Sequence, residues 1–137
     1  DLCHVPAVCA LPKGHRLRRR SVIRPKDLVD ESFMSFPLDG RMRHLIDAAF
    51  EQQSVNRRLQ IDVYSSAAAC ALVARGLGVA IVDPFTGRDY RREGIVILPF
   101  EPSIFYTFRV IRPRFREHSL LAESFLDRLK RELARPM

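Results

Sequence analysis

The chain lacks a long apolar run, because no uninterrupted stretch reaches the roughly 18 residues that a membrane span requires. Its first residues also lack the charged-then-apolar pattern of a secretory signal. The chain starts at Asp1 without a helical or capping lead-in, so we expect it to be a piece of a longer polypeptide. Its 47% apolar and 28% charged residues are ordinary for a globular domain, and we expect no contact with a membrane.

Cysteine is scarce, and metal-ligand patterns are missing. Cys3, Cys9 and Cys70 form no C-x-x-C pair, and the four histidines show no i, i+4 pairing. Small buried thiols behave as small hydrophobes, which predicts structural cysteines in a reducing compartment. We therefore expect no metal site and a location in the cytoplasm.

Catalytic motifs are also missing. The sequence contains no G-x-S-x-G elbow, P-loop or H-E-x-x-H pair. Gly76-Leu77-Gly78 follows a helical pattern and precedes a strand, which is the reverse of the order in a dinucleotide-binding loop. Ser65 and Ser66 have no histidine near them in the pattern, so helix capping is favoured over a nucleophilic role. We expect no catalytic residue, no enzymatic activity and no cofactor.

Acidic residues are outnumbered, which gives a net charge of +7. The basic residues concentrate at positions 16–20, 57–58, 91–92 and 112–116. None of these clusters is interleaved with aromatic residues or lies on a helix-turn-helix or zinc-finger pattern. The pattern indicates solvent-exposed arginines rather than a DNA-contacting surface.

Strand-like and helix-like segments alternate along the chain, which predicts an α/β fold. Apolar runs predict strands over residues 5–12, 33–36, 59–64, 79–82, 95–100 and 105–111. Helical periodicity predicts one turn over 25–29, a helix with the apolar stripe Met42, Leu45, Ile46, Ala49 and Phe50, a helix after Ser65, and a last helix after Ser119. Asp39 is placed to cap the second of these helices. Leu121, Ala122, Phe125, Leu126, Leu129 and Leu133 are the predicted core face of the last one.

Residues 65–84 carry the clearest pattern, a helix followed by a strand. Ser65 or Ser66 can cap the helix, and Gly76 stands where a left-handed residue ends one. The circumference of the helix is alanine, cysteine, leucine and valine, so we expect it to be covered on all sides. Its start offers free N–H donors and a positive dipole end, which favours binding of a small anion.

Three predicted strand ends carry polar turns, at residues 36–41, 64–66 and 82–86. Ligands of open α/β sheets bind at the carboxyl ends of the strands. The turns offer hydroxyls, the carboxylate of Asp83 and the guanidinium of Arg41. This lining suits a zwitterion whose carboxylate lies on Ser65 and Ser66 and whose ammonium lies near Asp83. For each residue alone, a turn or capping role remains an alternative.

Several segments resemble LysR-type transcriptional regulators. They are Ala10-Leu11-Pro12-Lys13-Gly14-His15-Arg16-Leu17, residues 33–50, and Ala71-Leu72-Val73-Ala74-Arg75-Gly76-Leu77-Gly78-Val79-Ala80. Cys70 and residues 82–86 are most similar to the branch that senses opines and basic or diamino acids. The resemblance runs from about Val5 to the final helix. Arg16 replaces the proline of the family's first turn.

The resemblance implies an effector-binding domain with a type II periplasmic-binding-protein fold, lacking the first part of its first subdomain. Residues 1–13 would be the end of that subdomain and a crossover strand, residues 14–103 the second subdomain, and residues 104–137 the return strand and the C-terminal helix. The effector would lie in the cleft between the subdomains. The family's N-terminal winged helix-turn-helix is absent from this chain, so we expect DNA contact only through such a part of the complete protein.

The expected effector is a small amino-acid-like or opine-like molecule. The candidate effector-binding residues are Phe36, Leu38, Asp39, Arg41, Ser65, Ser66, Asp83, Pro84, Phe85 and Thr86. The family pairs its effector domains side by side, which implies a homodimer or higher homo-oligomer with a surface at Met42, Leu45, Ile46 and Ala49. Two alternatives remain: a solute-binding protein of a transport system with the same fold, and an enzyme of similar architecture, which the missing nucleophile–base pair disfavours.

Overall fold

A computed structural model describes residues 1–112 and 119–133. Most of the basic cluster at 112–116 lies outside the described residues. The chain divides into two compact units, Val5–Tyr106 and a smaller one made of Asp1–His4 and Thr107–Met137. The predicted boundaries after residues 13 and 103 do not coincide with this division, which falls after His4 and after Tyr106, and they stay predictions. None of the described helices is long and apolar enough to cross a membrane.

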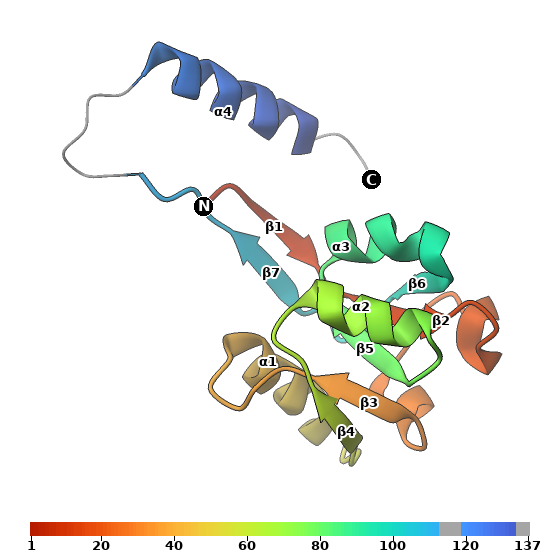
Figure 1. Cartoon of the computed structure of the whole chain (residues 1–137). Coiled ribbons are helices and arrows are strands. Elements are labelled where there is room, and N and C mark those ends of the chain that lie inside the picture. The colour runs from red at the N-terminus through yellow and green to blue at the C-terminus, as the bar shows by residue number, and fades with distance from the viewer. Residues whose placement is uncertain (113–118, 134–137) are drawn as a thin grey trace. The chain divides into compact units, whose positions relative to one another are not determined.

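The larger unit contains a five-stranded mixed sheet in the order β4-β3-β5-β2-β6 (Figure 1). The strands are β2 (Val8–Pro12), β3 (Ser32–Ser35), β4 (Arg58–Asp62), β5 (Val79–Val82) and β6 (Ile95–Pro99). β3 pairs in parallel with β4 and with β5, while β2 pairs antiparallel with β5 and β6. The predicted strand–helix–strand unit is confirmed, since β4 and β5 run parallel on either side of β3.

Helices lie on both faces of this sheet because its strands alternate their side chains. Phe33, Val79 and Ile81 pack with the buried face of α1 (Arg41–Glu51), including Ile46 and Phe50. Met34, Ala80 and Val82 pack instead with Ala69, Cys70 and Val73 of α2 (Ser66–Ala74). The unit is completed by α3 (Pro84–Asp89) and by three 3₁₀ turns, η1 (Arg16–Arg19), η2 (Pro25–Leu28) and η3 (Tyr90–Glu93).

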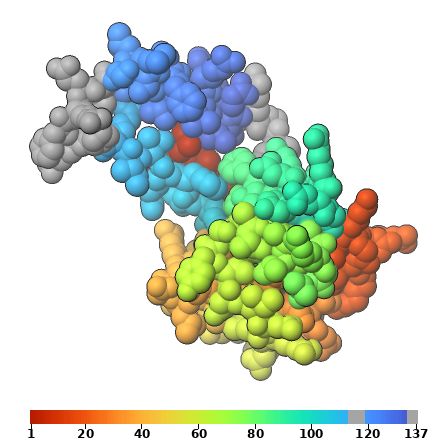
Figure 2. Space-filling view, in the orientation of Figure 1, coloured from red at the N-terminus to blue at the C-terminus, as the bar shows by residue number. Residues whose placement is uncertain are grey.

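The prediction that α2 is covered on all sides is wrong. Ala67 and Ala68 are exposed, while Ala69, Cys70 and Val73 are buried. Figure 2 shows the region of α2, in yellow-green, on the face of the molecule toward the viewer. A methyl group costs little when it is exposed, so an alanine-rich helix can leave one side in water even without any polar residue there.

Two strand predictions need correction. Residues 5–12 form two strands rather than one, β1 (Cys3–Pro6) and β2, which are separated at Ala7. The amide of Ala7 donates to the carbonyl of Ile104 (2.7 Å), so the chain changes sheets at this residue. β1 pairs with β7 (Phe105–Phe108) in a separate two-stranded sheet, and β7 ends before the predicted residue 111.

The smaller unit contains α4 (Leu120–Leu133), which begins directly after Ser119 as predicted. Its predicted core face is only partly confirmed, because Leu126 is buried whereas Leu121 and Phe125 are 80% and 63% exposed. Arg112 forms an ion pair with Glu123 in the first turn of α4.

Candidate functional site

The start of α2 is built by Ser65. Its Oγ accepts the N–H of Ala68 (3.1 Å) and its carbonyl accepts that of Ala69 (3.1 Å), so Ser65 is the N-cap. The geometry of an α-helix leaves the N–H groups of Ser66 and Ala67 without an intrahelical acceptor. The sequence analysis named Ser65 or Ser66 as the cap, and the structure assigns this role to Ser65.

Ser66 has a different role, because its Oγ accepts the N–H of Asp83 at 3.5 Å. This contact joins the start of α2 to the end of β5. Asp83 in turn caps α3, since its Oδ1 accepts the N–H of Thr86 (2.9 Å). The structure therefore brings Ser65, Ser66, Asp83 and Thr86 to one edge of the sheet, as the strand-end argument predicts.

Asp83 is less available to a ligand than the sequence suggests. It is 7% exposed, and one of its carboxylate oxygens is used in capping. Pro84, the first residue of α3, is buried as well, while Phe85 and Thr86 are partly buried. Gly87 permits the close packing of α3, because a Cβ at that position would lie 2.9 Å from Ile97. The α3 side of the site is thus largely buried, and only part of Phe85 and Thr86 is accessible to a ligand.

Sequence reasoning missed two hydroxyl groups near this edge, those of Tyr106 and Ser35. Among the described residues, both are buried without a hydrogen-bond partner. Burial raises the pKa of Tyr106, whose hydroxyl is close enough to Ser66 and Asp83 to be influenced by both. In the predicted strand 105–111, the side chain of Tyr106 points to the other face from those of Phe105 and Thr107. This alternation is the sequence signal that could have identified Tyr106. For Ser35, which ends a strand of apolar neighbours, the sequence gives no such signal.

The loop after β3 holds three of the predicted effector residues. Phe36 is partly buried against both faces of the core, whereas Leu38 and Asp39 are exposed. The prediction that Asp39 caps α1 is wrong: the N-cap is Gly40, and it makes no side-chain capping bond. The turn is closed instead by its backbone, as the N–H of Gly40 donates to the carbonyl of Pro37 (3.0 Å).

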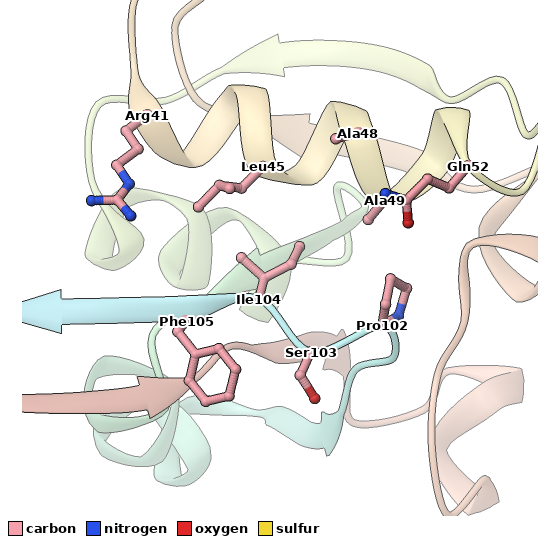
Figure 3. Close-up of a pocket in the computed structure, with 9 residues that line it drawn as sticks. All are labelled: Arg41, Leu45, Ala48, Ala49, Gln52, Pro102, Ser103, Ile104 and Phe105. Atoms are coloured by element: carbon pink, nitrogen blue, oxygen red, sulfur yellow. The ribbon is translucent and has the colours of Figure 1, made fainter.

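Arg41 lines a hollow of about 320 Å³ between α1 and residues 102–105 (Figure 3). Leu45 and Ala49 from α1 and Ile104 and Phe105 from the facing segment supply its apolar side chains. Of the predicted effector residues, only Arg41 is found among the described residues that line this hollow. The serines, which the sequence analysis had grouped with Arg41, are not among the described residues that line this hollow.

The predicted dimer surface on α1 needs a correction. Ile46 and Ala49 are 0% and 3% exposed because they pack into the core of their own unit. Met42 and Leu45 are only partly buried beside that core. The apolar stripe is thus mainly an internal packing face, and of its residues only Met42 and Leu45 remain partly accessible to a partner.

This architecture, a mixed sheet with helices on both faces and a polar edge at the strand ends, is that of a periplasmic-binding-protein-like fold. The Synechocystis PCC6803 CcmR regulatory domain, solved in complex with 2-PG, superimposes with a TM-score of 0.68 at 20% identity. The match covers 98% of this chain and 65% of that one.

The family model described as LysR substrate binding domain matches residues 1–134. The Transcriptional activator protein LysR of Escherichia coli (strain K12) is 34% identical over 130 residues, which are 95% of this chain and 42% of that protein. The Octopine catabolism/uptake operon regulatory protein OccR of Rhizobium meliloti is 27% identical over 121 residues, 88% of this chain and 40% of that protein. The chain belongs to the LysR substrate binding domain family. It spans less than half the length of these two relatives.

Proposed function

We propose that this chain is the effector-sensing part of a LysR-type transcriptional regulator, and that its effector is a small amino-acid-like or opine-like molecule. In the complete protein, a winged helix-turn-helix outside this chain would contact DNA in the cytoplasm. The observation that carries the proposal is the polar edge at Ser65, Ser66 and Asp83, with the buried hydroxyl of Tyr106 beside it. The likeness to the octopine regulator supports the choice of effector class.

The effector's carboxylate would lie at the start of α2. Three features favour an anion there: the N–H groups of the first turn, the positive end of the helix dipole, and the Ser66 hydroxyl. The ammonium group of the effector would face the remaining carboxylate oxygen of Asp83. Phe36 and Leu38 of the loop after β3, and Phe85 and Thr86 of α3, would contact the rest of the molecule, while Asp39 and Pro84 would shape the two turns.

A thermal-shift screen of the complete protein with octopine, L-lysine and L-arginine tests this function. A ligand at 100 times its dissociation constant stabilises the folded state by about 2.7 kcal/mol, which is readily seen as a raised melting temperature. We expect at least one of the three to give such a shift and D-glucose to give none. An unchanged melting temperature with all three would contradict the proposed effector class.

We also propose that two copies pair along the edge of α1. The hollow next to Leu45 is apolar on both sides, and Phe105 at its rim is 51% exposed. Exposed apolar surface rimmed by polar groups is typical of a protein contact. A second copy would cover these residues, with Met42 and Leu45 as its contacts on α1.

A further inference from the structure

A buried ion-pair network lies on α1, behind the loop that follows β3. Arg43 is 6% exposed, and its Nε donates to both carboxylate oxygens of Asp47, each at 3.0 Å. Asp47 also pairs with Arg57, whose side chain is 5% exposed. The sequence analysis expected residues 57–58 to be in solvent, which is wrong for Arg57. Its apolar surroundings explain this, because the guanidinium lies 4.9 Å from the ring centroid of Phe33 and 4.7 Å from that of Phe50.

The burial of two cations around one carboxylate is costly. It lowers the pKa of Arg57 to about 10, and the neighbouring Arg43 adds to this effect. A buried guanidinium is tolerated where its donors are used in well-defined hydrogen bonds. Arg43 makes such bonds to Asp47 on α1 and also to residues outside this helix.

Two of these contacts are to the segments that form the proposed effector edge. Nη1 of Arg43 donates to the main-chain carbonyl of Phe36 (2.9 Å), the first residue after β3. The same nitrogen lies 3.5 Å from Oδ1 of Asp62, the last residue of β4. Phe36 begins the loop that carries Leu38 and Asp39, and Asp62 stands three residues before the N-cap Ser65. One side chain thus contacts the base of both loops.

The space between the two loops is consistent with such a link. Leu38 from the first loop and Asp62 from β4 line the same hollow of about 170 Å³, and Arg43 is part of its wall. The strands below are already held in register, because the N–H of Val63 donates to the carbonyl of Ser35 (2.8 Å). Arg43 adds a side-chain link between the same two segments, from the carbonyl of Phe36 to the carboxylate of Asp62.

We propose that Arg43 is a positioning residue that sets the spacing between the loop at residues 36–40 and the loop at residues 63–66, and thereby the affinity for the effector. Arg43 does not touch the effector in this account; it acts through the carbonyl of Phe36 and the carboxylate of Asp62. The effect on affinity rests on the proposed function, whereas the effect on loop spacing does not. A planar, forked guanidinium can serve Asp47, Phe36 and Asp62 together, which the single ammonium of a lysine cannot do.

The test compares Arg43→Lys and Asp62→Asn with the control Arg16→Lys in the complete protein. Arg16 also donates to a carboxylate, that of Glu31, and to a backbone carbonyl, that of Asp27, but it lies on η1. Hydrogen–deuterium exchange is measured at the hydrogen-bonded amides of Gly40 and Val63, one in each loop, and in β2. Arg43→Lys loses a charged hydrogen bond, which should raise the exchange rate in both loops by about tenfold. Asp62→Asn loses only an exposed ion pair, which should raise it by about threefold. β2 should be unchanged in both.

Binding of octopine, L-lysine and L-arginine is then measured by calorimetry. We expect Arg43→Lys to weaken the compound that binds wild type by about tenfold and Arg16→Lys to leave it unchanged. Equal exchange in the loops of the variants and wild type, or an increase that includes β2, would overturn the positioning role. A loosened pair of loops with unchanged affinity would overturn the link to the effector. If wild type binds none of the compounds, the proposed effector class fails, and the exchange data still decide the role of Arg43.

Discussion

Two adjacent serines have separate roles at the start of α2. Ser65 caps the helix, so Ser65→Ala should lower the free energy of unfolding by about 1 kcal/mol. Ser66 instead contacts Asp83 and faces the proposed carboxylate, so Ser66→Ala should weaken effector binding by about fivefold, or about 1 kcal/mol, with a smaller loss of stability. Urea unfolding and calorimetry measure the two effects. The same loss of stability in both variants, with unchanged affinity in Ser66→Ala, would contradict this assignment.

The buried thiol of Cys70 should make stability depend on alkaline pH. Burial, with a contribution from Asp83, raises the pKa of Cys70 from 9.0 to about 12, and burial also raises the pKa of Cys9. The unfolded chain loses these protons near pH 9 while the folded chain keeps them. The stabilisation is therefore complete below pH 9 and is lost as the pH rises toward 12, by up to about 1.4 kcal/mol per pH unit for each thiol.

Urea unfolding near pH 8 and near pH 10 measures this loss. Cys70→Ala should reduce the difference between the two free energies of unfolding, whereas Cys3→Ala, at a partly exposed position, serves as the matched control. A pH difference as large in Cys70→Ala as in wild type would show that the folded state does not protect this thiol.

The turn between α2 and β5 depends on two glycines for different reasons. Gly76 has a φ of 77° and ends α2, where its N–H donates to the carbonyl of Val73 (2.8 Å) and that of Leu77 to the carbonyl of Leu72 (3.2 Å). No atom lies within 4 Å of a Cβ built there, so Gly76→Ala should cost about 1 kcal/mol of backbone strain. At Gly78, with a φ of 151°, a Cβ would lie 2.2 Å from the carbonyl oxygen of Ser32.

Gly78→Ala should therefore cost more than Gly76→Ala, about 2–3 kcal/mol, because the strain is joined by a clash with β3. Chemical denaturation of the two variants side by side gives the comparison. Equal losses would mean that β3 and the turn move apart to admit the methyl group.

The elements that the sequence predicted best are those with a strong local signal. The strand of four apolar residues after Gly78 and the helix between Ser65 and Gly76 are confirmed, because caps, glycine and apolar runs act over a few residues. The errors have non-local causes. Asp39 lost the capping role to a turn closed by backbone, and residues 5–12 divide at Ala7 because that amide pairs with a carbonyl 97 positions away.

The candidate site shows the same limit. The serines and Asp83 could be predicted because each lies within four residues of the end of a strand. Arg43 could not, since a charged residue next to an apolar stripe is ordinarily expected in solvent, and its partners come from Phe36 and Asp62. Tyr106 is likewise brought to Ser66 by the return of the chain through β7. Such contacts between distant segments are visible only in the folded unit.

Pairing of two copies is the prediction that concerns the molecule as a whole. Leu45→Glu places a charge in the hollow along α1 and should convert a dimer of the complete protein into a monomer in sedimentation experiments. Leu77→Glu is the matched control, because Leu77 is 47% exposed in the turn after α2. A dimer that persists in Leu45→Glu would place the contact between copies elsewhere.

The central claim is that an effector binds with its carboxylate at the start of α2. A crystal structure of the complete protein with the compound that gives the largest thermal shift tests it most directly. The account predicts the carboxylate within hydrogen-bond distance of Ser66 or the amide of Ala67, with the ligand's ammonium facing Asp83. Ligand density in the hollow between α1 and residues 102–105 instead, with water at the start of α2, would contradict it.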